Sequence, residues 1–304
     1  MNSIKRKAGD KMAVNRAMFG PGGNSESFYK QGNKSTLQAP EWVKKVGLDA
    51  YEYEAGRGVN ASDETFVSLG EKAKLAGISL SIHAPYFISL SSVEPEKRTG
   101  SAKYILDSAR ALSLMGGKTM VIHAGSCAKL DRTDALNFAK DAIHHALNVL
   151  SENGLYGFIL GIETMGKVNQ LGTLDEVLEM CSVDKTVCPV IDFGHMNARE
   201  QGGVFESVDD YKRIFDIVEK RKSPEAAYNM HCHFSKIEHT KGGEKRHLTF
   251  EDTVYGPDYV PLMQAIAQIG AAPTIICESD GTQAEDALEM KNTYAKYAGD
   301  IAGI

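Results

Sequence analysis

The sequence predicts an α/β protein with a single domain, a (β/α)8 TIM barrel. Short strand-like runs alternate with helix-like segments eight times, and 304 residues match the usual size of such a barrel. No internal repeat and no linker divides the sequence into halves. A doubly wound open sheet would give the same local pattern, but eight repeats of it favour the barrel. We expect residues 1–13 to form a flexible N-terminal tail and residues 14–304 to form the barrel.

The predicted strands are short apolar runs, as expected for a parallel sheet that is buried on both faces. The clearest is V-C-P-V-I-D, which begins at Val187 and ends in Asp192. A second type alternates polar and aromatic residues, as in the segment 49–55. The predicted strands cover residues 16–20, 49–55, 78–82, 119–122, 157–162, 187–192, 228–234 and 273–277.

Each strand is followed by a segment with the start and stop signals of a helix. Pro40 lies in the first turn of one such segment and Gly47 follows its end. Another opens with Ser62 and stops at Gly77. The predicted helices cover residues 40–47, 62–76, 101–115, 132–151, 173–181, 207–222, 258–270 and 284–297.

Composition indicates an ordinary soluble protein, with 42% hydrophobic and 24% charged residues. No apolar run approaches the roughly 20 residues that span a bilayer, and the basic start of the chain lacks the apolar core of a secretory signal. The five cysteines are odd in number and form no C-x-x-C, so we expect reduced core residues and a cytoplasmic location. The net charge of −6 argues against a strongly basic nucleic-acid binder but leaves room for a local positive groove.

Six predicted strands stop at a residue that can ligate a metal. In a barrel these ends converge on one face, where active sites lie. Any one of these residues alone could be structural, and Asp192 in particular could simply cap the next helix. His144 and His145 lie in the middle of a helix and are assigned to its surface or packing. The candidates are His83, His123, Glu163, Asp192, His231 and Glu278 at strand ends, with His195 and His247 in the loops that follow.

Eight candidate ligands are too many for one ion, because a catalytic zinc usually takes about three protein ligands and a water. The set therefore predicts two or three divalent ions that share at least one bridging carboxylate. Paired ions stabilise both the attacking and the leaving oxygen in phosphoryl transfer. The residues alone thus predict metal-assisted hydrolysis, most naturally of a phosphate ester.

Six short motifs, in order along the chain, carry a family resemblance. They are S-I-H-A-P-Y at 81–86, V-I-H-A-G at 121–125, I-E-T at 162–164, D-F-G-H at 192–195, H-x-x-x-S-K at 231–236 and C-E-S at 277–279. Together they resemble endonuclease IV, the zinc-dependent AP endonuclease of the xylose-isomerase-like TIM-barrel superfamily. The resemblance covers the chain from about residue 14 to its end.

The resemblance implies hydrolysis of DNA on the 5′ side of an abasic site, as part of base excision repair. It implies two or three Zn²⁺ ions, with Mn²⁺ as the other candidate, and Glu163 and Glu278 as catalytic carboxylates. Tyr86 matches a tyrosine that enters the DNA beside the flipped-out nucleotide. The implied ligands are His83, His123 and bridging Glu163 for one ion; Glu163, Asp192, His231 and Glu278 for a second; and His195 and His247 for a third.

Two motifs depart from the family pattern. The family's D-R-H is K-R-H here, and the ammonium of Lys245 cannot replace a carboxylate ligand. Glu244 could substitute if the loop shifts; otherwise the third metal is weak or absent. The family's H-L-N-D-S-K is H-C-H-F-S-K, which adds His233 on the same strand face as His231. His233 could be an additional ligand, a substrate contact or a hydrogen-bonded group behind the ligands.

A sugar isomerase or epimerase of the same superfamily is the alternative. Such enzymes keep one metal on a Glu-Asp-His-Glu set, which Glu163, Asp192, His231 and Glu278 match equally well. Glu52 and Glu54 would then suit the binding of sugar hydroxyls, and a net charge of −6 suits a neutral sugar. A non-catalytic barrel with structural metals is a third reading, although structural zinc sites are usually closed Cys/His sets.

A DNA substrate requires cations at the mouth of the barrel. Lys236 and Arg246 are the candidate phosphate contacts, because both fall in predicted loops after strands. Further lysines and an arginine lie in such loops and would complete a positive rim around the acidic ligands. These are Arg57, Lys167, Lys241 and Lys245.

Overall fold

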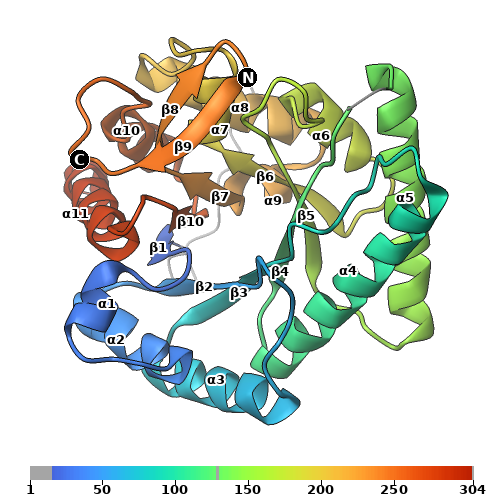
Figure 1. The fold of residues 1–304 in the computed structure, drawn as a ribbon. Helices are drawn as coiled ribbons and strands as arrows, with labels where there is room; N and C mark the ends of the chain where they lie inside the picture. The colour runs from blue at the N-terminus through green and yellow to red at the C-terminus, as the bar shows by residue number, and fades with distance from the viewer. Residues whose placement is uncertain (1–15, 128–129, 303–304) are drawn as a thin grey trace, which may run out of the picture.

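Eight parallel strands form the barrel that the sequence predicts (Figure 1), in the order β1-β10-β7-β6-β5-β4-β3-β2. The computed structural model describes residues 16–127 and 130–302, so the predicted tail, residues 1–13, lies outside the described residues. The strands are β1 Met18–Pro21, β2 Ala50–Glu54, β3 Ser79–His83, β4 Thr119–His123, β5 Ile159–Glu163, β6 Val187–Asp192, β7 His231–Phe234 and β10 Thr274–Cys277.

The sheet closes where β1 meets β2. Gly22 forms a parallel bridge with Glu52, and the Gly23 amide donates to the Glu52 carbonyl at 3.0 Å. The strands approach so closely at Gly20 that a Cβ there would lie 1.9 Å from the carbonyl oxygen of Ala50. Glycine is therefore required at this seam, because any side chain would force the two strands apart.

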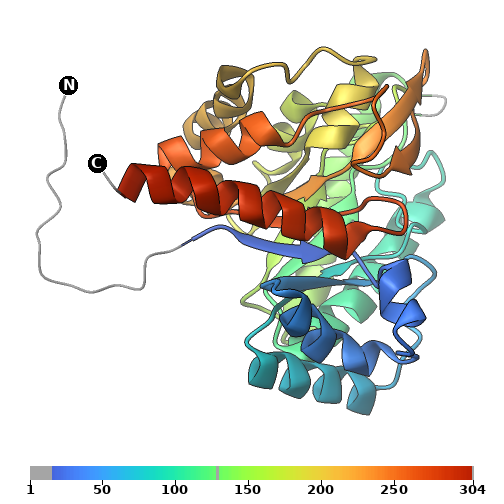
Figure 2. The same ribbon diagram turned by 90° about the vertical axis from the view of Figure 1, so that its left-hand side faces the viewer.

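Helices surround the sheet on the outside, as Figures 1 and 2 show. The eight predicted helices are present, although α4 begins at Pro95 instead of residue 101, and the short helices α1, α7 and α9 were not predicted. His195, expected in a loop, therefore lies in α7. The helices are α1 Glu26–Lys30, α2 Ala39–Val46, α3 Asp63–Ala76, α4 Pro95–Met115, α5 Arg132–Glu152, α6 Leu174–Met180, α7 Phe193–Arg199, α8 Val208–Arg221, α9 Pro224–Tyr228, α10 Val260–Ile269 and α11 Gln283–Ala302.

The segment 228–234 was predicted as one strand, and its first part is wrong. Ser223 caps a short helix, α9, by accepting from the amide of Ala226, and Pro224 fits its first turn. The strand β7 begins only at His231. His231 is therefore the first residue of β7, and His233 lies two residues further along it.

A two-stranded hairpin follows β7 and was not predicted. It comprises β8 (Lys236–Thr240) and β9 (Gly243–Leu248), which pair antiparallel around the two-residue turn 241–242. In Figure 2 the orange hairpin stands at the end of the barrel toward which the arrow of β1 points. It therefore borders the face on which the strand ends converge.

The remaining expectations concern burial. His144 and His145 are exposed on α5, as their position in the helix predicted. All five cysteines are free, and four of them are buried. Among the described residues, no helix is long and apolar enough to cross a membrane.

Candidate metal centre

The predicted ligands at the strand ends do converge on one face of the barrel. His83, His123, Glu163 and Asp192 are the last residues of four consecutive strands, β3 to β6. Glu278 directly follows β10, and its amide donates to the Phe234 carbonyl of β7 at 3.1 Å. Strand pairing thus fixes the backbone positions of the candidate ligands, because each is held by hydrogen bonds to a neighbouring strand.

Glu163 lies at the centre of this face, fully buried. Its Oε2 is 3.4 Å from the Nε2 atoms of both His83 and His123. Its Oε1 is 2.9 Å from His233 Nδ1 and 3.4 Å from His195 Nδ1. One carboxylate therefore faces two different groups of ligands, one through each oxygen, as a bridging ligand must.

The first group is formed by His83, His123 and Glu163. The Nδ1 atom of His83 lies 3.0 Å from the Ala84 carbonyl, which accepts its proton and leaves Nε2 toward Glu163. Burial opposes the charge on His83, but Glu163 and the neighbouring carboxylates outweigh it and raise its pKa to about 10. Burial and the nearby histidine charges lower the pKa of His123 to about 3.

The second group, which we call the strand set, differs from the prediction in one residue. It contains His233, not His231, together with Glu163, Asp192 and Glu278. Register explains the correction: Asp192 pairs with His233, whereas His231 pairs with Val190. Both histidines face the barrel interior, but His231 lies two residues, about 6–7 Å, further from the ligand face.

The third group, which we call the hairpin set, consists of His195, Glu244 and His247. His195 Nε2 lies 3.5 Å from Glu244 Oε2, and the Ser235 hydroxyl lies 2.9 Å from His247 Nδ1. Lys245 points elsewhere and pairs with Glu238 at 2.6 Å. Glu244, and not Lys245, is therefore the hairpin carboxylate that faces these two histidines.

Backbone contacts hold Glu244 in this position. Its amide donates to the Gly166 carbonyl at 3.0 Å, so the hairpin pairs with the loop after β5. A Cβ on Gly166 would lie 2.6 Å from the Cβ of Glu244. The guanidinium of Arg199 holds the same loop in place. It donates hydrogen bonds at 2.7–3.2 Å to four of the loop's carbonyls, those of Met165, Lys167, Val168 and Gln170.

Asp192 has two structural roles at once. Its Oδ1 accepts from the amide of His195 at 2.7 Å and caps α7, as the simpler sequence reading proposed. Its Oδ2 is buried, 3.2 Å from His195 Nδ1, without a hydrogen bond of good geometry in the described part of the chain. The second oxygen is therefore free to face the strand set.

The electrostatics of these groups fit a divalent cation. Within the described residues, the ion pairs recorded for Glu163, Asp192, Glu244 and Glu278 are all with histidines. Burial and the charges of Glu163 and Asp192 raise the pKa of Glu278 to about 7. A buried acidic cluster that no lysine or arginine neutralises, rich in imidazole and carboxylate donors, suits zinc or a similar metal.

A cavity of about 420 Å³ opens over these groups. Tyr86 lies at its edge, 61% exposed, with its ring centroid 5.5 Å from that of His123. Lys167 lines the cavity as well. The cavity is lined by His83, Tyr86, His123, Glu163, Met165, Lys167, Gln170, His195, Glu244, His247 and Glu278.

The predicted phosphate contacts Lys236 and Arg246 do not line this cavity. Lys236 donates to the carbonyls of Phe250 and Asp252, so it holds the loop after the hairpin. Arg246 lies on the outer side of the hairpin and pairs with Glu238 at 2.7 Å. Sequence position placed both on the correct face, but the hairpin turns them away from the ligands.

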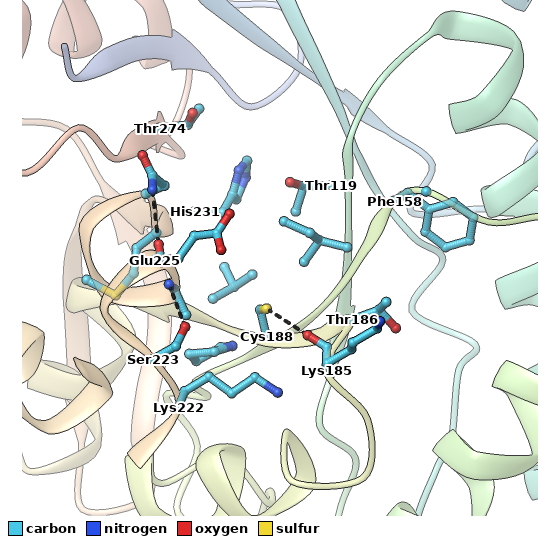
Figure 3. A pocket seen from close by; sticks show the side chains of 17 residues that line it. Thr119, Phe158, Lys185, Thr186, Cys188, Lys222, Ser223, Glu225, His231 and Thr274 are labelled. Atoms are coloured by element: carbon cyan, nitrogen blue, oxygen red, sulfur yellow. Dashed lines mark hydrogen bonds between the residues drawn. The ribbon is translucent and has the colours of Figure 1, made fainter. Parts of the chain in front are cut away.

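A second cavity, of about 650 Å³, lies at the opposite end of the barrel (Figure 3). Residues at the starts of strands, such as Thr119 and Thr274, line it, and His231 lies on its wall. Glu52 is fully buried and offers no exposed surface to a sugar hydroxyl, whereas Glu54 is exposed and its role in sugar binding stays a prediction. The partners of Glu52 are His231 and His233.

Comparison with known proteins agrees with this geometry. Residues 40–294 match the family model described as the xylose isomerase-like TIM barrel. The chain belongs to this family. An uncharacterized protein of Methanocaldococcus jannaschii is 34% identical over 255 residues, which cover 84% of this chain and 90% of that protein. A protein of Mycoplasma pneumoniae named "Probable endonuclease 4" is 26% identical over 243 residues, which cover 78% of this chain and 78% of that protein.

Solved structures of the xylose isomerase-like fold include both enzyme classes that the sequence raised. Endonuclease IV from Thermus thermophilus superposes with a TM-score of 0.63 at 18% identity, covering 88% of this chain and 96% of its own. An L-ribulose 3-epimerase superposes with a TM-score of 0.67 at 14% identity, covering 94% and 97%. The resemblance inferred from the motifs is confirmed at the level of the family, and the fold alone does not choose between the two chemistries.

Proposed function

We propose that this protein is a metal-dependent phosphodiester hydrolase that cuts DNA on the 5′ side of abasic sites. The observation that carries the proposal is the arrangement around Glu163, whose two oxygens face separate ligand groups 2.9–3.4 Å away. A sugar isomerase of this superfamily needs only the strand set. The group with His83 and His123, and the hairpin set, would have no ion to hold in a single-ion enzyme.

Each group has the donors that zinc uses in proteins. His83, His123 and Glu163 would hold one Zn²⁺, the strand set a second, and the hairpin set a third; Mn²⁺ is the other candidate. Bound there, the ions would supply Lewis-acid polarisation of a phosphoryl oxygen and activation of water near neutral pH. Glu163 and Glu278, the predicted catalytic carboxylates, both lie in the strand set and line the cavity.

Other residues of the cavity would bind and orient the DNA. The exposed ring of Tyr86 offers a flat surface beside the ligands, against which an unstacked nucleotide or sugar could lie. The ammonium of Lys167 lines the same cavity and could contact a phosphate oxygen. The cavity of about 420 Å³ is large enough for a sugar and its phosphate, not for a stacked duplex.

The direct test is cleavage of a labelled duplex that carries one tetrahydrofuran analogue of an abasic site. This analogue cannot undergo β-elimination, so only hydrolysis breaks the strand. We expect a 5′ fragment with a 3′-hydroxyl that a polymerase extends, formed with Zn²⁺ and lost after chelation. An intact duplex of the same sequence is the control. Failure to cut the analogue with Zn²⁺ or Mn²⁺ present contradicts the proposal.

The second candidate is a sugar isomerase or epimerase with one ion on the strand set. It is favoured by the presence of the complete Glu-Asp-His-Glu group, with His233 as its histidine. Metal analysis separates the candidates, because the hydrolase requires two or three ions per chain. One Mn²⁺ per chain, together with turnover of a ketose, would reverse the order of the two proposals.

A further inference from the structure

A buried carboxylate links the candidate metal centre to the interior of the barrel. Glu52 lies on β2, and its side chain contacts two histidines of β7, although β1 and β10 lie between these strands in the sheet. Glu52 and His233 are completely buried, and His231 is 8% exposed. The contact therefore crosses the barrel lumen, where water cannot satisfy these polar atoms.

Each oxygen of Glu52 faces one histidine through the same type of nitrogen. Oε2 lies 2.9 Å from His231 Nε2, and Oε1 lies 2.9 Å from His233 Nε2. In the described residues, Oε1 of Glu52 and Nε2 of His233 are both buried and have no hydrogen bond to another group, although they lie 2.9 Å apart. An orphaned buried donor and acceptor at this distance are each other's natural partners, because leaving both unpaired is costly.

The need for a donor in each of these contacts determines where His231 and His233 carry a proton. A carboxylate only accepts, so each Nε2 atom that faces Glu52 must carry a proton. With one proton on Nε2, His233 presents Nδ1 to Glu163 Oε1 at 2.9 Å and to Glu278 Oε1 at 3.4 Å. By the same rule Nδ1 carries a second proton in the metal-free protein, and a bound cation would replace that proton.

We propose that Glu52 is a positioning residue that keeps the proton of His233 on Nε2 and turns Nδ1 toward Glu163, Asp192 and Glu278. His231, which lines the second cavity (Figure 3), contacts the other oxygen of Glu52. This explains why the strand carries two inward histidines, of which only one reaches the ligands. The inference rests on the proposed metal centre, but it applies equally to the hydrolase and to the isomerase.

Carboxylates behind ligating histidines set the tautomer and the orientation of the ring, and their loss typically costs about 10–100-fold in metal affinity. Glu52→Gln keeps the shape but offers one acceptor and one donor where two acceptors are needed. We expect metal affinity to fall by about 10–100-fold. We also expect His233 to lose its uniform Nε2–H form, which long-range ¹H–¹⁵N spectra of histidine-labelled protein report.

His231→Gln is the matched control. Its amide can still donate to Glu52 Oε2, so the contact between Glu52 and His233 remains and metal affinity should stay close to wild type. A merely structural role for Glu52 predicts a different result: both variants would lower thermal stability, and neither would change the His233 spectrum or the metal dissociation constant. That result overturns the proposal.

The spectrum of the metal-free wild-type protein distinguishes this inference from the proposed function. A His233 ring protonated at Nε2 supports the role of Glu52 whether or not the protein later binds metal. A ring protonated only at Nδ1 overturns it. If Nε2 is protonated but neither Zn²⁺ nor Mn²⁺ binds, the proposed function fails while the Glu52–His233 contact stands.

Discussion

The strand set and the hairpin set are built in different ways. Glu163, Asp192 and His233 lie on strands that pair with neighbours on both sides, so their spacing follows from sheet register. Glu244 lies on a two-stranded hairpin that meets the barrel through the Gly166 carbonyl. The first set comes with the barrel itself, and both candidate chemistries can use it. The second is added by α7 and the hairpin, and only the proposed hydrolase would use it.

The largest effect is expected where both groups share a ligand. Glu163→Gln removes one negative charge from the oxygens that face His83, His123 and His233, so it should empty two sites at once. Activity should fall by at least about a hundredfold. Metal content and abasic-site cleavage are the measurements, with the exposed Glu225→Gln at the other end of the barrel as the control. Retained metal and activity would show that the centre is not built on Glu163.

A smaller and more selective effect is expected from Glu244→Gln. The neutral amide should weaken only the hairpin set, because Glu244 contacts His195 and not Glu163. We expect the loss of one ion per chain and about 10–100-fold lower cleavage, with the strand set still occupied. Equilibrium dialysis with metal analysis measures this. An unchanged ion count would mean that the hairpin set binds no metal, which favours the isomerase.

The strand ends were predictable because side chains alternate along a strand and parallel strands end on one face. The distinction between His231 and His233 was not, because it depends on the pairing of Asp192 with His233 across two strands. Such register is a property of the folded sheet, and a single sequence does not contain it. Likewise, the link between Glu52 and β7 crosses the barrel and joins residues 179 positions apart.

The sequence analysis missed the hairpin of β8 and β9 for a different reason. Its signal was present, since Gly242 and Gly243 separate two short runs of mixed polarity. Glu244 was named from the sequence as a possible substitute for the family's Asp, but its position near His195 depends on the backbone contact with Gly166. For the same reason, Lys236 and Arg246 were assigned to the correct face but not to their true partners.

Gly166→Ala tests whether that contact positions the hairpin set. The new methyl group would collide with Glu244 and push the hairpin outward, since the two carbons would be 2.6 Å apart. We expect a severalfold loss of metal at this set only, and a stability cost of about 1–3 kcal/mol from overpacking. Gly100→Ala, on exposed α4 with nothing within 4 Å, is the control. Equal behaviour of the two variants would contradict the positioning role.

The smallest effect is expected from Lys245→Asp, which restores the family motif. Lys245 pairs with Glu238 on the outer side of the hairpin, so the new carboxylate would face away from His195. The ion count should not change, and stability should fall only slightly, because exposed ion pairs contribute little. A rise in metal content on titration with Zn²⁺ would show instead that Asp at 245 reaches the site and that Glu244 does not serve.

Asp192 divides its carboxylate between two tasks, capping α7 with one oxygen and facing the strand set with the other. Folding therefore immobilises this ligand before any cation arrives, and binding does not have to supply the entropy of ordering it. This double role makes Asp192 a poor probe of metal binding, since its substitution would remove the cap of α7 and a ligand at the same time. Glu163 has no capping duty, so its variants report on the centre alone.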